Sequence, residues 1–243
     1  MQLVVLSGGK GVRLYPITLN LPKTMVKING KPILEYHIEH AKKFGIKEIV
    51  MCIGHLPEKI IEHFGDGSKF GVNIKYSIEK ESLGTGGPLA LAKDLIKEDF
   101  FLLNGDIMCT MDMIKLEAFH RKNEALVSVV IHKSNHPEDS DLIEIDNETR
   151  IKKIWTKPHK IKPLPTNLTN AGAYFCSKEI LNHIPLEQIS FERVILPQLV
   201  KDNKKIYGYY TNEFLRDVGT HERLKEIEDL IRNNNGRLPE YLY

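Results

Sequence analysis

The stretch LVVLSGGKGVRL, residues 3–14, decides the fold of this chain. Its first four residues are all apolar and stop at Ser7, Gly8 and Gly9, a pattern typical of a strand buried on both faces of a sheet. Glycines at positions 8, 9 and 11 permit positive φ angles and let backbone N–H groups approach an anion closely. The loop is neither a P-loop, which needs G-K-[ST], nor the dinucleotide motif G-x-G-x-x-G.

Cations near this loop favour an anionic ligand. Lys10 and Arg13 lie within it, and Arg13 can hold a phosphate through two parallel hydrogen bonds. Lys23 follows Pro22, ten residues after Arg13. A lone lysine is usually a solvated surface charge, but the carboxyl edge of an open α/β sheet is where ligands bind. The loop and its cations together favour a polyphosphate ligand.

Outward from this loop, the first half of the chain alternates strand-like and helix-like segments. Short apolar runs predict strands at residues 46–53, 73–78, 100–103 and 126–132. Apolar residues at the helical period predict helices at residues 32–44, 57–64 and 87–96, and from Thr110 or Asp112 to about 122. This alternation with short connections is the signature of a parallel sheet with right-handed crossovers.

The pattern changes after about residue 135. The expected elements are an antiparallel hairpin at 142–145 and 151–155, a strand at 170–176, a helix capped by Ser177 to about 183, a helix at 191–199, a strand at 206–211 and a helix capped by Thr220 to about 233. Residues 157–169 are polar and proline-spaced, and we expect a loop that could cover a site. With no repeat or low-complexity linker, residues 1–243 form one α/β domain with a mixed, mainly parallel sheet.

Composition limits the class of protein. Among 243 residues, 34 Lys plus Arg and 32 Asp plus Glu leave a formal charge of +2, which argues against a strongly basic nucleic-acid binder. The three cysteines lie far apart without a CxxC pair, so we expect neither a disulfide framework nor a zinc site. No apolar stretch approaches the roughly 18–20 residues of a membrane span, and no signal-peptide pattern follows Met1. We expect a soluble cytoplasmic protein that binds neither nucleic acid nor membrane.

Further motifs follow the first loop in a fixed order. They are LGTGGP at residues 83–88, LNGD at 103–106, WTKP at 155–158, NAG at 170–172 and DVGT at 217–220. With G-G-x-G-x-R-L and the P-K pair, they resemble the nucleoside-diphosphate-sugar pyrophosphorylases, the sugar-1-phosphate nucleotidyltransferases. The resemblance spans nearly the whole chain and implies their Rossmann-like nucleotide-diphospho-sugar transferase fold. Long family members add a C-terminal left-handed β-helix domain, which we do not expect here because the sequence ends soon after its last helix.

Among subfamilies, the chain most resembles mannose-1-phosphate and D-glycero-D-manno-heptose-1-phosphate guanylyltransferases. In the family reaction, a sugar 1-phosphate attacks the α-phosphorus of a nucleoside triphosphate in line and expels pyrophosphate. The attacking phosphate is already anionic near neutral pH, so the site must hold two anions together and neutralise charge. The resemblance implies Arg13, Lys23 and Asp106 as catalytic residues. It also implies Asp106 and Asp217 as ligands of the cofactor Mg²⁺.

The resemblance implies a nucleotide-binding half at about residues 1–132 and a sugar-phosphate-binding half at about 133–243. The implied nucleotide contacts are Leu6, Ser7, Gly8, Gly9, Gly11, Arg13, Glu79, Gly84 and Thr85. Glu79 stands just before the LGTGGP loop, where the family reads the base edge, but it could equally be a solvated charge in the run 79–81. A carboxylate offers only acceptors. It can accept N1–H and N2–H of guanine together, which favours GTP over UTP or CTP.

The implied contacts to the sugar 1-phosphate come from the second half. Lys157 would bind its phosphate, and Asn170 and Gly172 would line the sugar site. Thr156 stands where the family commonly has a glutamate that binds sugar hydroxyls. The shorter side chain leaves space and removes an acceptor, so we expect a manno-configured hexose or heptose 1-phosphate rather than glucose 1-phosphate.

Two alternatives remain open. A uridylyl- or cytidylyltransferase could act on another sugar phosphate or on a phosphomonoester such as phosphocholine. A non-catalytic regulatory subunit that senses a nucleotide sugar would have lost the metal aspartates or the phosphate-binding cations, and this chain retains them. A homo-oligomer is compatible with the sequence, which does not identify the base, the sugar, an allosteric site or the pathway.

Overall fold

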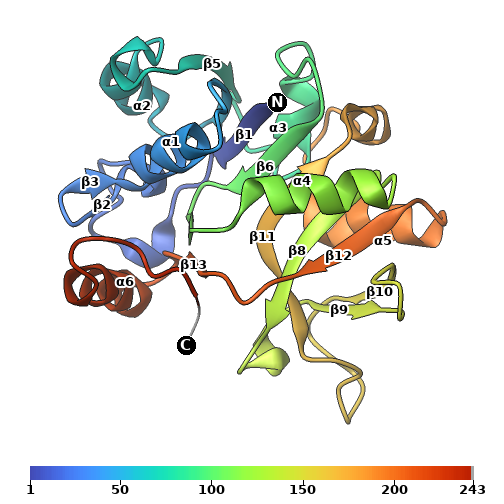
Figure 1. The fold of residues 1–243 in the computed structure, drawn as a ribbon. Helices are drawn as coiled ribbons and strands as arrows, with labels where there is room; N and C mark the ends of the chain where they lie inside the picture. The colour runs from blue at the N-terminus through green and yellow to red at the C-terminus, as the bar shows by residue number, and fades with distance from the viewer. Residues whose placement is uncertain (242–243) are drawn as a thin grey trace.

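The computed structural model describes residues 1–241, with only the backbone at Asp139, and its centre is a nine-stranded sheet (Figure 1). The strands span Gln2–Ser7 (β1), Glu48–Ile53 (β4), Asn73–Ile78 (β5), Phe100–Asn104 (β6), Val127–Lys133 (β8), Leu142–Ile145 (β9), Ile151–Trp155 (β10), Leu168–Cys176 (β11) and Ile206–Tyr210 (β12). Their order is β10-β9-β11-β6-β1-β4-β5, with β8 and β12 joined beside β11. Strands β6, β1, β4 and β5 are parallel, whereas β11 pairs antiparallel with β6, β8 and β9. The predicted α/β fold with a mixed, mainly parallel sheet is confirmed.

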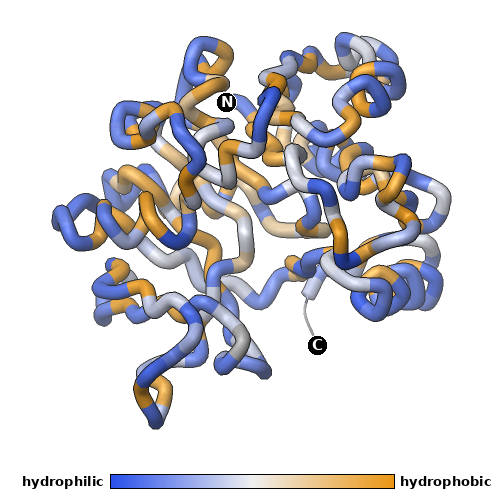
Figure 2. Tube along the Cα trace, turned by 180° about the vertical axis from the view of Figure 1, so that it is seen from behind, coloured by the Kyte–Doolittle hydropathy of each residue, from blue (hydrophilic) through white to orange (hydrophobic). Residues whose placement is uncertain are grey.

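Helices cover both faces of the sheet and enclose two hydrophobic cores. The α-helices span Ile33–Lys43 (α1), Pro57–Phe64 (α2), Gly87–Leu91 (α3), Met113–Lys122 (α4), Leu196–Lys201 (α5) and His221–Asn233 (α6). Helices α1, α2 and α4 pack with Leu3 and Val5 of β1, and α3 and α5 belong to the cluster of Val4 on the other face. Because neighbouring side chains of a strand point to opposite faces, the apolar run of β1 contributes to both cores. Figure 2 shows hydrophobic residues along the central strands and hydrophilic ones along the outer loops. In residues 1–241, no helix is long and apolar enough to cross a bilayer.

Strand β11 joins the two parts of the sheet and is irregular in its middle. Its register with β8 shifts between Asn170 and Tyr174, where Gly172 has a φ of 74°. A residue with a Cβ adopts this conformation only at a cost. After the irregularity, Ala173 pairs with Leu103 of β6. The bend therefore carries the NAG motif to the carboxyl end of β6, next to the LNGD motif.

Two short antiparallel pairs complete the structure, and the sequence did not predict them. Ile107–Cys109 (β7) pairs with Leu215–Asp217 (β13), and Lys27–Ile28 (β2) pairs with Lys31–Pro32 (β3). Strands of two or three residues are too short for an alternation of apolar and polar side chains to appear. The β7–β13 pair brings the DVGT motif beside the LNGD motif.

Several predicted helices differ in the structure. Helix α3 ends at Leu91 instead of residue 96, because the N–H groups of Lys93 and Leu95 bond three residues back and form turns. Residues Lys178–His183 form a 3₁₀ helix that Ser177 does not cap, since the Ser177 hydroxyl donates to the carbonyl of Ala125 at 2.9 Å. The segment predicted at 191–199 is a π-helix, Phe191–Ile195, followed by α5. The predicted caps Asp112 and Thr220 both accept a backbone N–H and are confirmed.

A buried histidine makes the stability of this fold depend on pH. His120 is 3% exposed and contacts the hydroxyls of Ser128 and Ser177, each at 3.0 Å. Burial lowers the pKa of His120 to about 4, while Asp99 opposes this shift and Arg121 adds to it. The unfolded chain binds this proton near pH 6.5 and the folded chain does not. The free energy of unfolding must therefore fall as the pH decreases from 7 towards 4.

We expect His120 alone to remove about 2 kcal/mol of unfolding free energy between pH 7.5 and pH 5. Urea denaturation of the parent and of His120→Gln at both pH values measures this loss. The glutamine variant should lose correspondingly less, while His37 and His40, whose pKa values burial also lowers, contribute equally to both proteins. If the unfolding free energy of both proteins depends on pH in the same way, His120 is not the source of this loss.

Candidate active site

The loop after β1 lies directly against Lys23. Gly11 has a φ of 63°, and a Cβ there would lie 2.8 Å from the Cβ of Lys23. The Thr18 hydroxyl donates to the Gly11 carbonyl at 2.8 Å. The 3₁₀ turn Val12–Leu14 then buries Leu14 completely. Position 11 therefore requires glycine for two reasons: the loop turns there with a positive φ angle, and Lys23 leaves no space for a side chain.

Lys23 forms an ion pair with Asp106 at the end of β1. The two side chains are 12% and 26% exposed. Asp106 follows Gly105, where a Cβ would lie 2.6 Å from the Leu6 carbonyl oxygen and 2.7 Å from the Ser7 hydroxyl. The Gly105 N–H donates to that carbonyl at 2.8 Å. Because Gly105 has no side chain, the LNGD turn can press against the end of β1.

Asp217 reaches the same region from the C-terminal part of the chain. The pairing of β13 with β7 places it beside the end of the LNGD motif. Its Oδ1 and the Nη2 of Arg13 both lie next to Gly219, where a Cβ would be 2.3 Å from the first atom and 3.0 Å from the second. Asp217 also pairs with Arg223 of α6, and the hydrogen bond that Arg223 donates to Asp217 raises the pKa of Arg223. Sequence reasoning missed Arg223.

Asp106 and Asp217 suit the coordination chemistry of Mg²⁺. Their side chains are 26% and 30% exposed; Asp106 directly precedes β7, and Asp217 ends β13, which pairs with β7. Within residues 1–241, no group of three or more His, Cys, Asp or Glu side chains could hold a metal ion. Mg²⁺ takes one or two carboxylates and completes its shell with water and phosphate oxygens. The two aspartates therefore fit a magnesium ion that binds together with a phosphate ligand.

Glu79 lies beneath the glycine-rich loop, so the solvated-charge interpretation is wrong. It is 8% exposed. A Cβ at Gly8 would lie 2.0 Å from its Oε1, and a Cβ at Gly54 would lie 2.7 Å from the same atom. Its Oε2 accepts the Leu83 N–H at 3.0 Å, and burial raises the pKa of Glu79. The carboxylate therefore joins the loops that follow β1, β4 and β5.

The LGTGGP loop at residues 83–88 packs against a segment from the second half. Gly84 has a φ of 75°, and a Cβ there would lie 2.5 Å from the Ile189 carbonyl oxygen. Ile189 forms two backbone hydrogen bonds with the loop, at 2.9 and 3.0 Å. The Thr85 hydroxyl donates to the carboxylate of Glu192. Residues from both halves thus hold the loop that is predicted to bind the nucleotide.

The NAG motif lies beside the LNGD turn. A Cβ at Gly172 would be 3.1 Å from Nδ2 of Asn104. The Asn170 amide oxygen accepts the Gly172 N–H at 2.8 Å, and its Nδ2 donates to the Tyr174 hydroxyl at 2.8 Å. The predicted sugar contacts Asn170 and Gly172 therefore lie close to the turn that carries Asp106.

Glu192 connects these motifs, and sequence reasoning missed it. Its carboxylate accepts hydrogen bonds from Thr85, from Ser190 at 3.2 Å, and from Asn104 and Tyr174 at 3.4 Å each. Three of these partners lie 18, 88 and 107 positions away in the sequence. The local signal was the helix-capping position of Ser190, which indicates a helix start but no partner.

Thr156 and Lys157 are exposed at the end of β10, where a long loop leaves the sheet (Figure 1). The Lys157 N–H donates to Oδ1 of Asp141 at 2.9 Å, and Arg193 Nε donates to Oδ2 of Asp141 at 2.8 Å. Asp141 therefore ties the start of this loop to the residue after Glu192. Among the interactions of the described residues, none links the Thr156 side chain to the other predicted sugar contacts.

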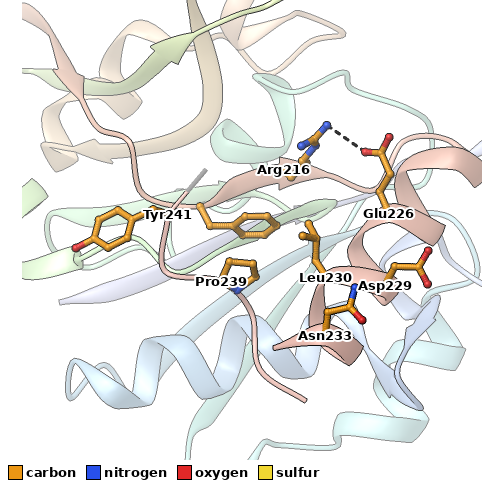
Figure 3. Close-up of a pocket in the computed structure, with 8 residues that line it drawn as sticks. Arg216, Glu226, Asp229, Leu230, Asn233, Pro239 and Tyr241 are labelled. Carbon is orange, nitrogen blue, oxygen red and sulfur yellow. Dashed lines mark ion pairs between the residues drawn. The ribbon is translucent and has the colours of Figure 1, made fainter. Parts of the chain in front are cut away.

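A cavity of about 400 Å³ lies between β13, α6 and the C-terminal segment (Figure 3). Phe214, Leu230 and Tyr241 supply apolar walls, and Arg216 pairs with Glu226 at 3.1 Å. Because neighbouring residues of a strand face opposite sides, Arg216 and Asp217 point away from each other. The cavity is therefore separate from the cluster around Asp106 and Asp217.

Comparisons with known protein families, sequences and structures give the same class of protein as the motifs. The nucleotidyl transferase family matches residues 2–234, and the chain belongs to this family. The resemblance to the sugar-1-phosphate nucleotidyltransferases that the motifs indicated is confirmed.

Relatives of known name cover most of the chain. The mannose-1-phosphate guanylyltransferase of Mycobacterium tuberculosis is 35% identical over 233 residues, which cover 94% of this chain and 64% of that protein. The mannose-1-phosphate guanyltransferase of Saccharomyces cerevisiae is 34% identical over 225 residues, covering 90% and 61%. The chain thus spans about three fifths of the length of these relatives. The crystal structure of HddC from Yersinia pseudotuberculosis superposes with a TM-score of 0.79 at 26% identity, covers 94% of this chain and 98% of its own, and is also known complexed with GMP-PN.

The packing of Glu79 against Gly8 predicts a difference between two neighbouring glycines. In Gly8→Ala the new methyl group would lie 2.0 Å from Glu79 Oε1, so the buried carboxylate must move. We expect the free energy of unfolding to fall by about 1–3 kcal/mol. Gly9→Ala is the matched control, because nothing lies within 4 Å of a Cβ at that position. Chemical denaturation compares the two variants, and equal midpoints would disprove the contact.

Proposed function

We propose that the chain is a sugar-1-phosphate nucleotidyltransferase, and specifically a guanylyltransferase for a manno-configured hexose or heptose 1-phosphate. The observation that carries this proposal is the meeting of Arg13, Lys23, Asp106 and Asp217 at the end of β1. Transfer of a nucleotidyl group to a sugar 1-phosphate brings two anions together. It therefore requires cations and a carboxylate pair suited to Mg²⁺. The names of the two guanylyltransferase relatives support the base and the sugar.

In the proposed reaction, an oxygen of the sugar 1-phosphate forms a bond to the α-phosphorus as the bond to the β-phosphate breaks. No residue needs to remove a proton from the attacking phosphate, because it is anionic near neutral pH. Arg13 and Lys23 bind the phosphates, and the ion pair with Asp106 holds Lys23 in one orientation. Asp106 and Asp217 would hold Mg²⁺, which when bound adds positive charge at the phosphate oxygens.

Glu79 is proposed to select guanine. It lies at the junction of the glycine-rich loop and the LGTGGP loop, where both predicted sets of nucleotide contacts meet. A carboxylate oxygen can accept more than one hydrogen bond, so the Leu83 N–H leaves capacity for a base. A mismatched base edge would leave a buried polar group unpaired, which costs about 1–3 kcal/mol. The HddC complex with GMP-PN supports nucleotide binding on this fold.

Lys157, Thr156, Asn170 and Gly172 are proposed to contact the sugar 1-phosphate. In this proposal, residues from about 1 to 132 bind the nucleotide, and residues from about 133 to 243 bind the sugar phosphate. The two halves are not independent, because residues 83–88 hydrogen-bond to a segment of the second half.

A pyrophosphate-release assay of five nucleoside triphosphates against glucose, mannose and manno-heptose 1-phosphates tests the function. We expect the highest kcat/KM with GTP and a manno-configured sugar. Glu79→Gln should reduce the preference for GTP by about tenfold or more. A preference for a pyrimidine triphosphate would favour the uridylyl- or cytidylyltransferase alternative, and no turnover with any pair would favour the regulatory subunit.

Asp106→Asn should keep the fold and lower kcat by about 100-fold or more. Asparagine is nearly isosteric, but it removes the charge that faces Lys23 and that suits Mg²⁺. Turnover at several Mg²⁺ concentrations and a urea unfolding curve measure the two effects separately. Asp229→Asn is the control, because Asp229 pairs with Arg232 at 3.3 Å and lines the separate cavity. A kcat within a few-fold of the parent would show that Asp106 has no part in the reaction.

A further inference from the structure

We propose that Glu192 binds the sugar directly, with its Oε1 accepting a ring hydroxyl, and so determines which sugar 1-phosphate is used. This inference rests on the proposed function and adds a specificity-determining residue to it. Glu192 is partly exposed and lies on the π-helix Phe191–Ile195. π-Helices are rare in proteins, and those that occur are often found at functional sites.

The two oxygens of Glu192 are held very differently. Oε2 accepts hydrogen bonds from Thr85 and from Ser190, the residue that begins the π-helix. Oε1 faces Nδ2 of Asn104 and the hydroxyl of Tyr174, both at 3.4 Å. Donor–acceptor distances are usually about 2.7–3.2 Å for N–H···O hydrogen bonds and about 2.5–3.0 Å for O–H···O bonds. One oxygen therefore orients the carboxylate, while the other retains capacity for a closer donor such as a sugar hydroxyl.

Asn104 offers a second acceptor beside this oxygen. Its Oδ1 is buried and has no hydrogen-bond partner in the part of the chain that the structure describes. Buried polar atoms are normally paired, so this atom marks a place where a donor is missing. The same amide lies against Gly172, whose N–H is held by Asn170. The unpaired amide oxygen of Asn104 and the loosely held Oε1 of Glu192 thus belong to two side chains in contact beside Gly172, at the predicted sugar site.

Glu192 is also linked to the residue proposed to bind the phosphate of the same substrate. Arg193 pairs with Asp141 at 2.8 Å, and Asp141 accepts the Lys157 N–H at 2.9 Å. Asp141 therefore connects the backbone of Lys157 to the residue that follows Glu192, and the proposal assigns the phosphate to Lys157 and a sugar hydroxyl to Glu192. Thr156 supplies no carboxylate and is exposed, whereas the carboxylate of Glu192 contacts the Tyr174 hydroxyl, which in turn accepts a hydrogen bond from Asn170 of the NAG motif.

A purely structural role makes a different prediction. If Glu192 only anchors Thr85 and Tyr174, its neutralisation should weaken the use of every sugar 1-phosphate by the same factor. If it binds a hydroxyl, its neutralisation should matter only for substrates that carry that hydroxyl. Deoxy analogues of the substrate distinguish the two cases.

The experiment measures kcat/KM for the best sugar 1-phosphate, expected to be mannose 1-phosphate, and for its 2-, 3-, 4- and 6-deoxy analogues. In the parent, the loss of the contacted hydroxyl should lower kcat/KM by about 10- to 100-fold, as expected for a hydrogen bond to a charged group. In Glu192→Gln, whose amide oxygen is a neutral and weaker acceptor, the same deletion should cost several-fold less than in the parent, and the KM for GTP should stay within about threefold of the parent. Glu187→Gln, at an exposed position of the same segment, should behave like the parent.

Glu192→Asp guards against loss of folding. It keeps the charge but shortens the side chain, so it should retain part of the discrimination between the substrate and the deoxy analogue. If each analogue loses the same factor in the parent, in Glu192→Gln and in Glu192→Asp, Glu192 does not contact the sugar, although the enzyme is active. If the parent releases no pyrophosphate with any pair of substrates, the proposed function itself fails, and this inference fails with it.

Discussion

Close approach of backbone segments at the carboxyl end of β1 is the constraint on which the rest of the site depends. Three glycines leave space for a close neighbour. Glu79 packs against Gly8, Lys23 packs against Gly11, and the end of β1 packs against Gly105. Three segments from different parts of the sequence can therefore converge on one strand end. The ion pair of Lys23 with Asp106 forms among them with little exposure, and a charge in that setting needs its partner in place.

The irregular middle of β11 extends this convergence into the second half of the chain. It directs Asn170 and Gly172 towards the end of β6, while the same strand continues in regular pairing with β6 and β8. Glu192 then connects Tyr174 of β11 to Thr85 of the loop after β5. The contacts assigned to nucleotide and to sugar are consequently parts of one hydrogen-bonded unit rather than of two modules joined by a linker.

Local signals sufficed where local chemistry determines the structure. The apolar run before Ser7 indicated a strand buried on both faces, and Asp112 and Thr220 indicated helix starts; all three are observed. Glu192 could not be found in this way, because no pattern around residue 192 indicates donors that lie 88 and 107 positions away. Ser177 shows the same limit. Its residue type suits a helix cap, but its hydroxyl donates to the carbonyl of Ala125, which is distant in the sequence and lies near only because of tertiary packing.

The pairing of β7 with β13 also determines when during synthesis the carboxylate pair can exist. Asp106 and Asp217 are 111 positions apart (217 − 106), and the strand that carries Asp217 precedes the last helix. Chains begin to fold from the N-terminal end as they emerge from the ribosome, and contacts between distant positions form late. A nascent chain can thus complete the glycine-rich turn long before it can bring the second aspartate beside the first. The two aspartates can therefore lie side by side only after synthesis has passed residue 217 and β13 has paired with β7.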